Sequence, residues 1–377
     1  MIKVGITGES GFIGSHLRNA LQLYNEEFEL VPFRDEFFTD DRQLTQFVVS
    51  CNVIVHLAAM NRHGDPQVIY DTNIRLVKKL IWTLDQNQSK AHVLVSSSIQ
   101  EDIDNIYGRS KKEGRELLAD WADRNGVLFT GFVFPNIFGP FGNPYNNSFI
   151  ATFSHQLTHG EIPTIEIDKK VPLLYVGEAV NAMINAIRGK QNIRECRITH
   201  SAEIKVKDIL ELLKSFNSVY AKHGIIPEVI NTFEINLFNT FRGYMDIKNH
   251  FPVKYVQYKD NRGDFVEIIK QNGGGQVSFL TTRPGITRGN HFHTRKIERF
   301  SVIKGKALIQ LRRIGTKEVF DFYLSGDEPA YVDMPIWYTH NITNIGNDDL
   351  YTIFWINELF NPKDSDTFVE NVVKLET

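Results

Sequence analysis

The sequence has 377 residues, of which 42% are hydrophobic and 23% are charged, and its formal net charge is −3 at pH 7. This length exceeds one ordinary domain and this composition is typical of a soluble globular chain, so we expect two domains. The near-neutral charge argues against a nucleic-acid or membrane-surface partner, and no apolar run is long enough to cross a bilayer.

A glycine-rich turn follows the first predicted strand, Ile2–Ile6, and precedes a predicted helix, Ser15–Tyr24. Glycines three residues apart let the backbone turn sharply and approach a pyrophosphate, which the amino end of the helix attracts. A tight turn without any ligand is the alternative interpretation. The cofactor contacts predicted in this turn are Gly8, Ser10, Gly11, Phe12, Ile13 and Gly14.

The next two predicted strands end in further candidates for cofactor binding. Phe28–Phe33 leads to Arg34, at the position that faces the adenosine ribose in dinucleotide folds. An arginine there suits the 2′-phosphate of NADP, whereas an acid suits the 2′-hydroxyl of NAD. Arg34 favours NADP, but a solvated surface arginine is equally compatible and Asp35 beside it blurs the distinction. The strand Asn52–Leu57 ends in Leu57-Ala58, where a small residue lets a flat ring approach the backbone.

Tyr107 and Lys111 are four residues apart at the start of a predicted helix, so their side chains share one face. A nearby ammonium favours the phenolate of a tyrosine, and such a pair can exchange a proton with a carbonyl and alcohol couple. The strand His92–Val95 runs into serines, of which Ser98, or alternatively Ser97, could hold the carbonyl oxygen. Alone, this spacing is usually a packed ring beside a solvated amine.

These motifs together resemble the extended short-chain dehydrogenase/reductases, many of which act on nucleotide sugars, over about residues 1 to 240. The resemblance implies that Tyr107 is the proton donor, Lys111 tunes its pKa and anchors the ribose, and Ser98 orients the carbonyl. The sequence departs from the usual family pattern in two places. Fewer residues than usual separate Ser98 from Tyr107, and the arginine that is common just before the Pro135-Asn136 pair is absent. The segments that carry the resemblance are Thr7–Gly14, His56–Ala59, Ser98, Tyr107–Lys111, Pro135–Pro140 and Tyr175–Glu178.

The pattern changes near residue 245, where we place the boundary between domains 1–245 and 246–377. Beyond it, short β-branched and aromatic runs alternate with glycine, proline and aspartate turns, which predicts an antiparallel sandwich or barrel. The predicted strands are Gln276–Thr282, Phe300–Ile303, Ala307–Arg312, Val319–Leu324 and Tyr351–Asn357.

Three histidines and a carboxylate lie within this second domain. His291 and His293 are two apart on a strand and point to the same side, Glu298 follows, and His340 comes from a later strand. This set is a plausible site for zinc, iron, manganese or nickel. A lone pair of histidines at this spacing is usually not a ligand pair, but the framing glycines, the proline and the fourth ligand favour a metal site.

The motif Gly285–Gly305 and the motif Pro335–Asn344 resemble the two halves of the cupin superfamily. Asp260–Glu267, Gln276–Ser278 and Arg288–His291 are similar to cupin-fold epimerases of 4-keto-6-deoxy nucleotide sugars. Some of those enzymes work without a metal, so the base cannot be carried over to a chain that has the full ligand set. The expected fold class is a Rossmann-like doubly wound parallel sheet followed by an all-β cupin, or jelly-roll, barrel.

The whole chain resembles the bifunctional capsular-polysaccharide enzymes of the route to UDP-N-acetyl-L-fucosamine. That resemblance implies a cupin that inverts C-3, next to the ketone of a UDP-4-keto-6-deoxy-HexNAc, and a reductase that uses NADPH to form UDP-2-acetamido-2,6-dideoxy-L-talose. It also implies zinc as the metal and a homodimer. Asn136, Asn147 and Arg288 are the candidates for substrate binding, although Arg288 could equally be an exposed loop arginine.

Two other functions stay open from the sequence: a reductase with a purely structural, dimerising cupin, and a non-catalytic nucleotide-sugar sensor. The intact Tyr107 and Lys111 argue against the sensor. Cys51 and Cys196 are far apart without metal-like spacing, which favours a reducing compartment. Because the first strand begins almost at Met1, we expect no signal peptide and a cytoplasmic protein.

Overall fold

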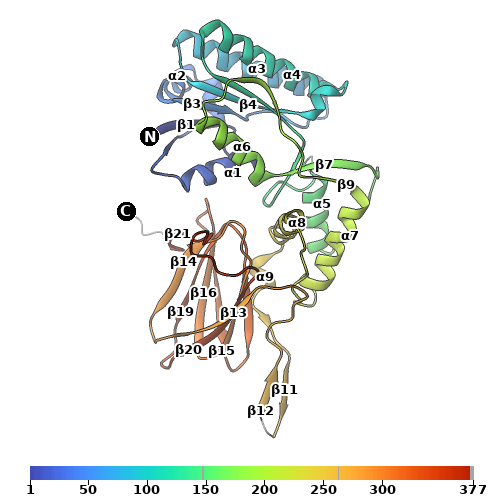
Figure 1. Ribbon diagram of the computed structural model, residues 1–377, viewed down its shortest axis with the longest axis vertical. Coiled ribbons are helices and arrows are strands. Elements are labelled where there is room, and N and C mark those ends of the chain that lie inside the picture. The colour runs from blue at the N-terminus through green and yellow to red at the C-terminus, as the bar shows by residue number, and fades with distance from the viewer. Residues whose placement is uncertain (147, 262, 374–377) are drawn as a thin grey trace. The chain divides into compact units, whose positions relative to one another are not determined.

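The computed structural model describes residues 1–146, 148–261 and 263–373, and Figure 1 shows its elements. The chain forms two compact units, Met1–Thr152 with Ile165–Lys207, and Phe153–Thr164 with Asp208–Thr377. Residues 208–245 thus pack with the second unit, and the domain boundary near residue 245 stays a prediction from the sequence pattern. None of the described helices is long and apolar enough to cross a membrane.

The first unit is built on a six-stranded parallel sheet with the strand order β2-β1-β3-β4-β5-β8. Because β1 pairs with β2 on one side and with β3 on the other, the chain reverses direction across the sheet there, and such switch points open a crevice at the carboxyl ends of the strands. The strands are β1 Ile2–Thr7, β2 Phe28–Val31, β3 Val53–His56, β4 His92–Ser98, β5 Phe129–Phe134 and β8 Ile193–Arg197.

Helices cover both faces of this sheet. Helices α1 and α6 pack on one face through a core that includes Leu17 and Met183, and α2, α3 and α4 pack on the other through a core that includes Leu44 and Leu118 (Figure 1). All four residues of β3 are buried, as expected for a central strand of a covered parallel sheet. The helical elements are α1 Phe12–Gln22, η1 Asp35–Thr39, α2 Asp41–Ser50, α3 Pro66–Gln86, η2 Ile99–Asp102, α4 Ile106–Asn125 and α6 Val176–Arg188.

A small three-stranded sheet, β6-β7-β9, completes the first unit, with β6 Asn136–Phe138, β7 Lys170–Tyr175 and β9 Ala202–Lys205. Two helices, α5 Phe149–Thr158 and α7 Val206–Phe216, run from one unit into the other. The second unit then contains a π-helical turn, Asn217–Ala221, and the helices α8 Thr232–Arg242 and α9 Ile247–His250.

Two antiparallel five-stranded sheets form the rest of the second unit, in the orders β10-β18-β15-β20-β13 and β17-β16-β19-β14-β21. A hairpin of β11 Gln257–Asp260 and β12 Gly263–Val266 precedes them. The strands are β10 Val253–Lys254, β13 Gln276–Thr282, β14 Thr287–Phe292, β15 Glu298–Lys304, β16 Lys306–Arg313, β17 Val319–Ser325, β18 Ala330–Met334, β19 Tyr338–Asn344, β20 Leu350–Ile356 and β21 Phe368–Val369.

The predicted fold class, a Rossmann-like parallel sheet followed by an antiparallel β unit, is confirmed. Helix boundaries differ from the sequence-based expectation in two informative places. The first helix begins at Phe12 rather than Ser15, because Gly11 is its N-cap, so the glycine turn leads directly into the helix. Helix α3 begins at Pro66, earlier than the predicted helix Ile74–Leu84, because Asp65 caps it by accepting a hydrogen bond from Gln67 N at 2.9 Å.

Candidate functional site

The glycine turn connects β1 to α1 at the switch point of the parallel sheet. Gly8 has a φ of +73°, which favours glycine, and a Cβ on Gly14 would lie 2.2 Å from the Gly8 carbonyl oxygen. Any side chain at Gly14 would therefore force the turn away from the helix. The result is a backbone cradle whose amide groups open onto the start of α1, as a pyrophosphate requires.

A cavity of about 580 Å³ lies over this cradle. Of the predicted cofactor residues, those that line it are Gly8, Ser10, Gly11, Phe12, Ile13, Gly14, Leu57 and Ala58. Asp35 also lines it, whereas Arg34 is exposed and ends the extended segment before η1. Glycines without steric bulk, a helix amino end and apolar walls fit a dinucleotide. The structure thus places the acid of the Arg34-Asp35 pair nearer to this cavity than the sequence pattern suggested.

A second cavity, of about 500 Å³, shares Gly11, Phe12, Ile13 and Leu57 with the first and contains the predicted catalytic residues. Tyr107, Lys111 and Ser98 all line it, as does Asn136. Gly108, which follows Tyr107, packs so closely against η2 that a Cβ there would lie 1.9 Å from the Gln100 carbonyl oxygen. The strand ends and the start of α4 therefore bring these side chains together.

Burial raises the pKa of Tyr107 to about 12. It also lowers the pKa of Lys111 to about 8, although the nearby negative charge of Glu101 acts to raise that pKa. The Tyr107 pKa thus moves opposite to the direction expected from the Tyr-Lys spacing alone, because desolvation disfavours the phenolate. A phenol that stays protonated at neutral pH is suited to give a proton to a carbonyl oxygen that is being reduced.

Hydrogen bonding distinguishes the two candidate serines. The Ser97 hydroxyl donates to the buried Glu101 carboxylate at 2.6 Å, so Ser97 can offer only an acceptor to the cavity. Ser98 Oγ accepts from Gln100 N at 3.2 Å, which leaves its hydroxyl hydrogen available for an acceptor in the cavity. A ketone oxygen is such an acceptor, so the geometry favours Ser98 over Ser97 as the group that orients a carbonyl.

Sequence reasoning missed the buried ion pair behind this site. Arg115 donates to both oxygens of Glu101, at 2.8 and 3.2 Å, and both residues are buried. The pair fixes the Glu101 carboxylate, which accepts the hydrogen bond from Ser97. The negative charge of Glu101 also raises the pKa of Lys111, against the lowering by burial. The glutamate and the arginine lie on separate elements, η2 and α4, and nothing in their spacing distinguishes them from surface charges.

Lys111 carries a cost in stability that can be measured. Its folded-state pKa of about 8 lies below the ordinary 10.5, so the ammonium costs the folded state on the order of 3 kcal/mol below pH 8. This cost falls as the pH rises from 8 to 10.5. We therefore expect Lys111→Met to raise the free energy of unfolding by about 2 kcal/mol at pH 7 and less at pH 10.

Denaturant unfolding of the cofactor-free protein at the two pH values measures this difference. The control is Lys112→Met, which changes an exposed neighbour on the same helix and should alter stability by less than about 0.5 kcal/mol. Equal stabilities of Lys111→Met and the unmodified protein at pH 7 would contradict the burial penalty.

Of the two predicted substrate residues in the first unit, one lines the second cavity and the other lies outside the described residues. Asn136 is exposed and donates to the Pro172 carbonyl oxygen at 3.1 Å, so it is fixed in place beside the cavity. Asn147 lies outside the described residues. Asn143, Asn146 and Ser148, near it in the chain, also line the cavity and supply the amide and hydroxyl groups that sugar hydroxyls bind.

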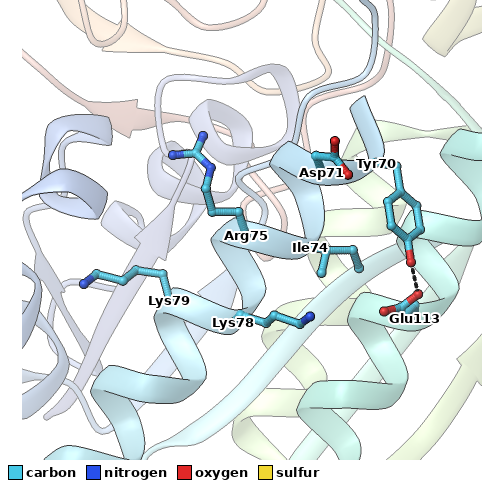
Figure 2. A pocket seen from close by; sticks show the side chains of 7 residues that line it. All are labelled: Tyr70, Asp71, Ile74, Arg75, Lys78, Lys79 and Glu113. Atoms are coloured by element: carbon cyan, nitrogen blue, oxygen red, sulfur yellow. Dashed lines mark hydrogen bonds between the residues drawn. The ribbon is translucent and has the colours of Figure 1, made fainter. Parts of the chain in front are cut away.

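A groove of about 540 Å³ on the surface of α3 and α4 is separate from these residues (Figure 2). Charges of both signs line it, and Tyr70 donates a hydrogen bond to Glu113 across it. Three cations and two carboxylates line it, so the groove does not carry charge of one sign alone. Its lining residues are Tyr70, Asp71, Ile74, Arg75, Lys78, Lys79 and Glu113.

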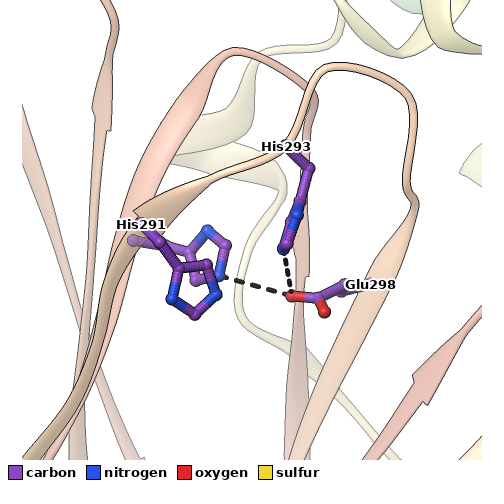
Figure 3. Close-up of side chains that lie close together, drawn as sticks. His291, His293 and Glu298 are labelled. Atoms are coloured by element: carbon purple, nitrogen blue, oxygen red, sulfur yellow. Dashed lines mark ion pairs between the residues drawn. The ribbon is translucent and has the colours of Figure 1, made fainter. Parts of the chain in front are cut away.

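The second unit brings all four predicted metal ligands together. One side-chain nitrogen or oxygen from each of His291, His293, Glu298 and His340 lies within 4.8 Å of the others, and Figure 3 shows His291, His293 and Glu298 converging. His291 pairs with His340 across β14 and β19, after an irregularity in β14. There Gly289 and Asn290 have φ values of +99° and +58°, so the strand bulges before the first histidine.

The chemistry of this cluster fits a divalent metal. Glu298 Oε2 lies 3.1 Å from His293 Nε2 and 3.3 Å from His340 Nε2, and these three buried atoms have no further polar partner among the described residues. Burial, aided by the two neighbouring imidazoles, lowers the pKa of His291 to about 4, so this ring is neutral at pH 7. Although burial alone would raise the pKa of Glu298, hydrogen bonds from His293 and His340 bring it well below its usual range. The neutral His291 imidazole and the ionised Glu298 carboxylate are thus in the forms that ligate a metal.

Arg288, the substrate candidate of this unit, lies on β14 three residues before His291. It is exposed, and its Nη2 donates to the Thr281 carbonyl oxygen at 3.2 Å. Its role in binding a sugar diphosphate stays a prediction.

Two protein families match parts of the sequence. The NAD dependent epimerase/dehydratase family matches residues 4–199, and the polysaccharide biosynthesis C-terminal domain matches residues 258–368. The UDP-2-acetamido-2,6-β-L-arabino-hexul-4-ose reductase of Pseudomonas aeruginosa is 32% identical over 375 residues, which cover 98% of this chain and 99% of that protein.

Solved structures agree with these matches. The crystal structure of the capsular polysaccharide assembling protein CapF from Staphylococcus aureus has a TM-score of 0.62 and 33% identity, and covers 98% of this chain and 100% of that one. A structure of CapF with the inhibitor 3-isopropenyl-tropolone has a TM-score of 0.60 and 30% identity, with the same coverage.

Proposed function

Because this chain belongs to the NAD dependent epimerase/dehydratase family, and more narrowly to the nucleotide-sugar reductase/epimerases of capsule biosynthesis, we propose that it has two activities on one UDP-linked sugar. The second unit epimerises C-3 of a UDP-4-keto-6-deoxy-HexNAc. The first unit reduces the 4-keto group with NADPH and forms UDP-2-acetamido-2,6-dideoxy-L-talose. The observation that carries this proposal is the joint occurrence, in one chain, of the Tyr107-Lys111-Ser98 cavity and the four-ligand cluster.

The residues of the first cavity support the reduction step. NADPH, when bound, supplies the hydride for the ketone carbon. The Ser98 hydroxyl donates to the ketone oxygen and orients it, and the protonated Tyr107 phenol gives a proton to that oxygen as the alcohol forms. Lys111, four residues after Tyr107 on α4, would contact the cofactor ribose, and its ammonium would offset part of the burial penalty of a Tyr107 phenolate.

The cluster of the second unit supports the epimerisation. A 4-keto group makes the neighbouring C–H bond acidic, so a base removes the C-3 proton and a proton returns on the opposite face. A divalent metal, which we propose is zinc, would be held by His291, His293, Glu298 and His340, and supplies Lewis-acid polarisation of the substrate. The described residues do not single out the base.

The preference for NADPH follows from Arg34, whose guanidinium suits the 2′-phosphate. We expect Arg34→Ala to raise the KM for NADPH about tenfold, which corresponds to about 1.4 kcal/mol of lost binding, and to leave the KM for NADH nearly unchanged. Steady-state kinetics with both coenzymes measure this. Arg42→Ala, at an exposed arginine of α2, is the matched control and should change neither value.

A wild-type protein that uses NADH better than NADPH would contradict the assignment and indicate that Asp35, in the cavity wall, binds a free 2′-hydroxyl instead. We also propose a cytoplasmic homodimer. The native mass against 43.3 kDa for one chain tests the assembly.

The experiment that tests the two activities together uses the UDP-4-keto sugar in deuterated water. Without NADPH, the proposal expects deuterium at C-3. With NADPH, it expects coenzyme oxidation and the L-talo product by NMR. Coenzyme oxidation without any deuterium incorporation would favour a reductase with a structural second unit. A flat NADPH absorbance trace would favour a nucleotide-sugar sensor.

A further inference from the structure

A C-terminal segment, residues 364–372, lies along the edge of the sheet that carries His291 and His340, two of the four candidate metal ligands, and we call it the C-terminal strap. It contains β21, which pairs with β14 so that Val369 is opposite His291 and Phe368 is opposite Phe292. The rings of Phe292 and Phe368 stack with their centroids 5.4 Å apart. The strap therefore contacts the histidine-bearing strand directly.

The far end of the strap is fixed to the sheet by the buried Arg312 of β16. Its guanidinium donates to the Val372 and Asn371 carbonyl oxygens at 2.7 and 2.8 Å and to Glu370 Oε1 at 2.7 Å. These bonds satisfy a buried cation on strap groups, and buried cations are rarely left unpaired. The strap is thus hydrogen-bonded to the sheet at this end.

Asp366, near the start of the strap, contacts the candidate ligand His293 through its backbone. The Asp366 carbonyl oxygen lies 2.5 Å from His293 Nδ1 and can accept its hydrogen. In the neutral ring this bond places the proton on Nδ1, so Nε2, which lies 3.1 Å from Glu298 Oε2, is the nitrogen that a metal would take. Backbone carbonyls that accept from the second ring nitrogen of a histidine commonly orient it toward a metal.

The side chain of Asp366 holds the loop that follows His293. Its carboxylate accepts from Thr294 N and Arg295 N, each at 3.0 Å, from Lys296 N at 3.0 Å and from Thr294 Oγ1 at 2.6 Å. Asp366 is 5% exposed and has a φ of +43°, a backbone conformation that aspartate and asparagine adopt more readily than alanine. One residue thus fixes both the ring of His293 and the loop between His293 and Glu298.

We propose that Asp366 is a positioning residue for the metal site: its carbonyl sets the tautomer and ring orientation of His293, and its carboxylate holds the loop that spaces His293 from Glu298. The inference rests on the proposed metal site. It gives a function to the C-terminal strap, which lies outside the two sequence motifs that contain the candidate ligands.

Metal affinity of the purified full chain tests the proposal. We expect Asp366→Ala to weaken zinc binding about 10- to 100-fold, as loss of an orienting partner typically does, measured by competition with a chromophoric chelator. Asp366→Asn keeps the left-handed backbone and one acceptor oxygen, so its loss should be several-fold smaller. The matched control is Asp364→Ala, in the same strap, whose exposed carboxylate pairs with Arg295; it should stay within about twofold of the unmodified protein.

The visible spectrum of the cobalt(II) form gives a second readout, because a displaced histidine alters the ligand-field bands. Circular dichroism and thermal unfolding in EDTA show whether each variant is folded without metal. If Asp366→Ala does not fold, the zinc affinity and the cobalt spectrum of Asp366→Asn test the positioning role instead. Unchanged affinity and spectrum in a folded Asp366 variant would overturn the positioning role alone. A wild-type chain that binds neither ion would overturn the proposed metal site, and this inference with it.

Discussion

Replacing Tyr107 by phenylalanine is expected to lower kcat for ketone reduction about 1,000-fold, within the 100- to 10,000-fold range typical of general acids. The substitution removes only the hydroxyl of a residue that lines the cavity, so the KM for NADPH should change little. The physical reason is that the alkoxide formed on hydride transfer then lacks its nearest proton source, while Ser98 can still orient the carbonyl. NADPH oxidation at 340 nm with the 4-keto sugar measures the rate.

Tyr70→Phe provides the control for Tyr107→Phe. It removes another tyrosine hydroxyl of the first unit, one that hydrogen bonds to Glu113 on the surface of α3 and α4 (Figure 2), and it should leave kcat within about twofold. If Tyr107→Phe oxidised NADPH at the rate of the unmodified protein, Tyr107 would not be the proton donor. Because burial raises the pKa of Tyr107 to about 12, we expect the phenol to keep its proton up to about pH 10 in the cofactor-free protein.

Glu298→Gln is expected to abolish deuterium exchange at C-3 and to weaken zinc affinity by more than about 100-fold, beyond the effect typical of residues that only orient a ligand. The amide has the shape of the carboxylate but lacks the charge that His293 and His340 face at 3.1 and 3.3 Å. Reduction of a sugar supplied already epimerised should continue, because the Tyr107 cavity lies entirely in the first unit. NMR in deuterated water, with zinc analysis of the same samples, gives both readouts.

Glu328→Gln is the matched control for this change. Glu328 is an exposed glutamate of the second unit whose carboxylate pairs with Lys254, and its loss should alter neither exchange nor metal content. Exchange that persists in zinc-free Glu298→Gln would show that epimerisation needs no metal. Exchange that is absent already in the unmodified protein would leave the second unit with a structural role.

Expectations from the sequence were most accurate where one element carries the whole motif. The helix that begins near Tyr107 was predicted, and it spans Ile106–Asn125. Helix α2, Asp41–Ser50, was missed although a signal existed: Asp40 caps it by accepting from Arg42 N and Gln43 N. Its apolar face, with Leu44 and Val48 buried, is short, and this helix was not among the predicted elements.

Some features had no signal in the linear pattern. The choice between Ser97 and Ser98 depends on Glu101, whose carboxylate accepts the Ser97 proton, and Glu101 is paired with an arginine of another element. The contact of Asp366 with His293 joins residues more than seventy positions apart. Neither contact follows from spacing, because residues distant in sequence meet only when sheets and loops close.

The sequence by itself determined the local geometry of this protein: the glycine turn, the shared face of Tyr107 and Lys111, and the closeness of His291 and His293, two residues apart at the end of β14. Backbone periodicity fixes these over a few residues. Only the tertiary structure decided which of these parts meet, which serine keeps a free proton, that Asp35 lines the cofactor cavity, and that His340 completes the cluster with His291. Those outcomes depend on desolvation and long-range pairing, and both exist only after the chain has folded.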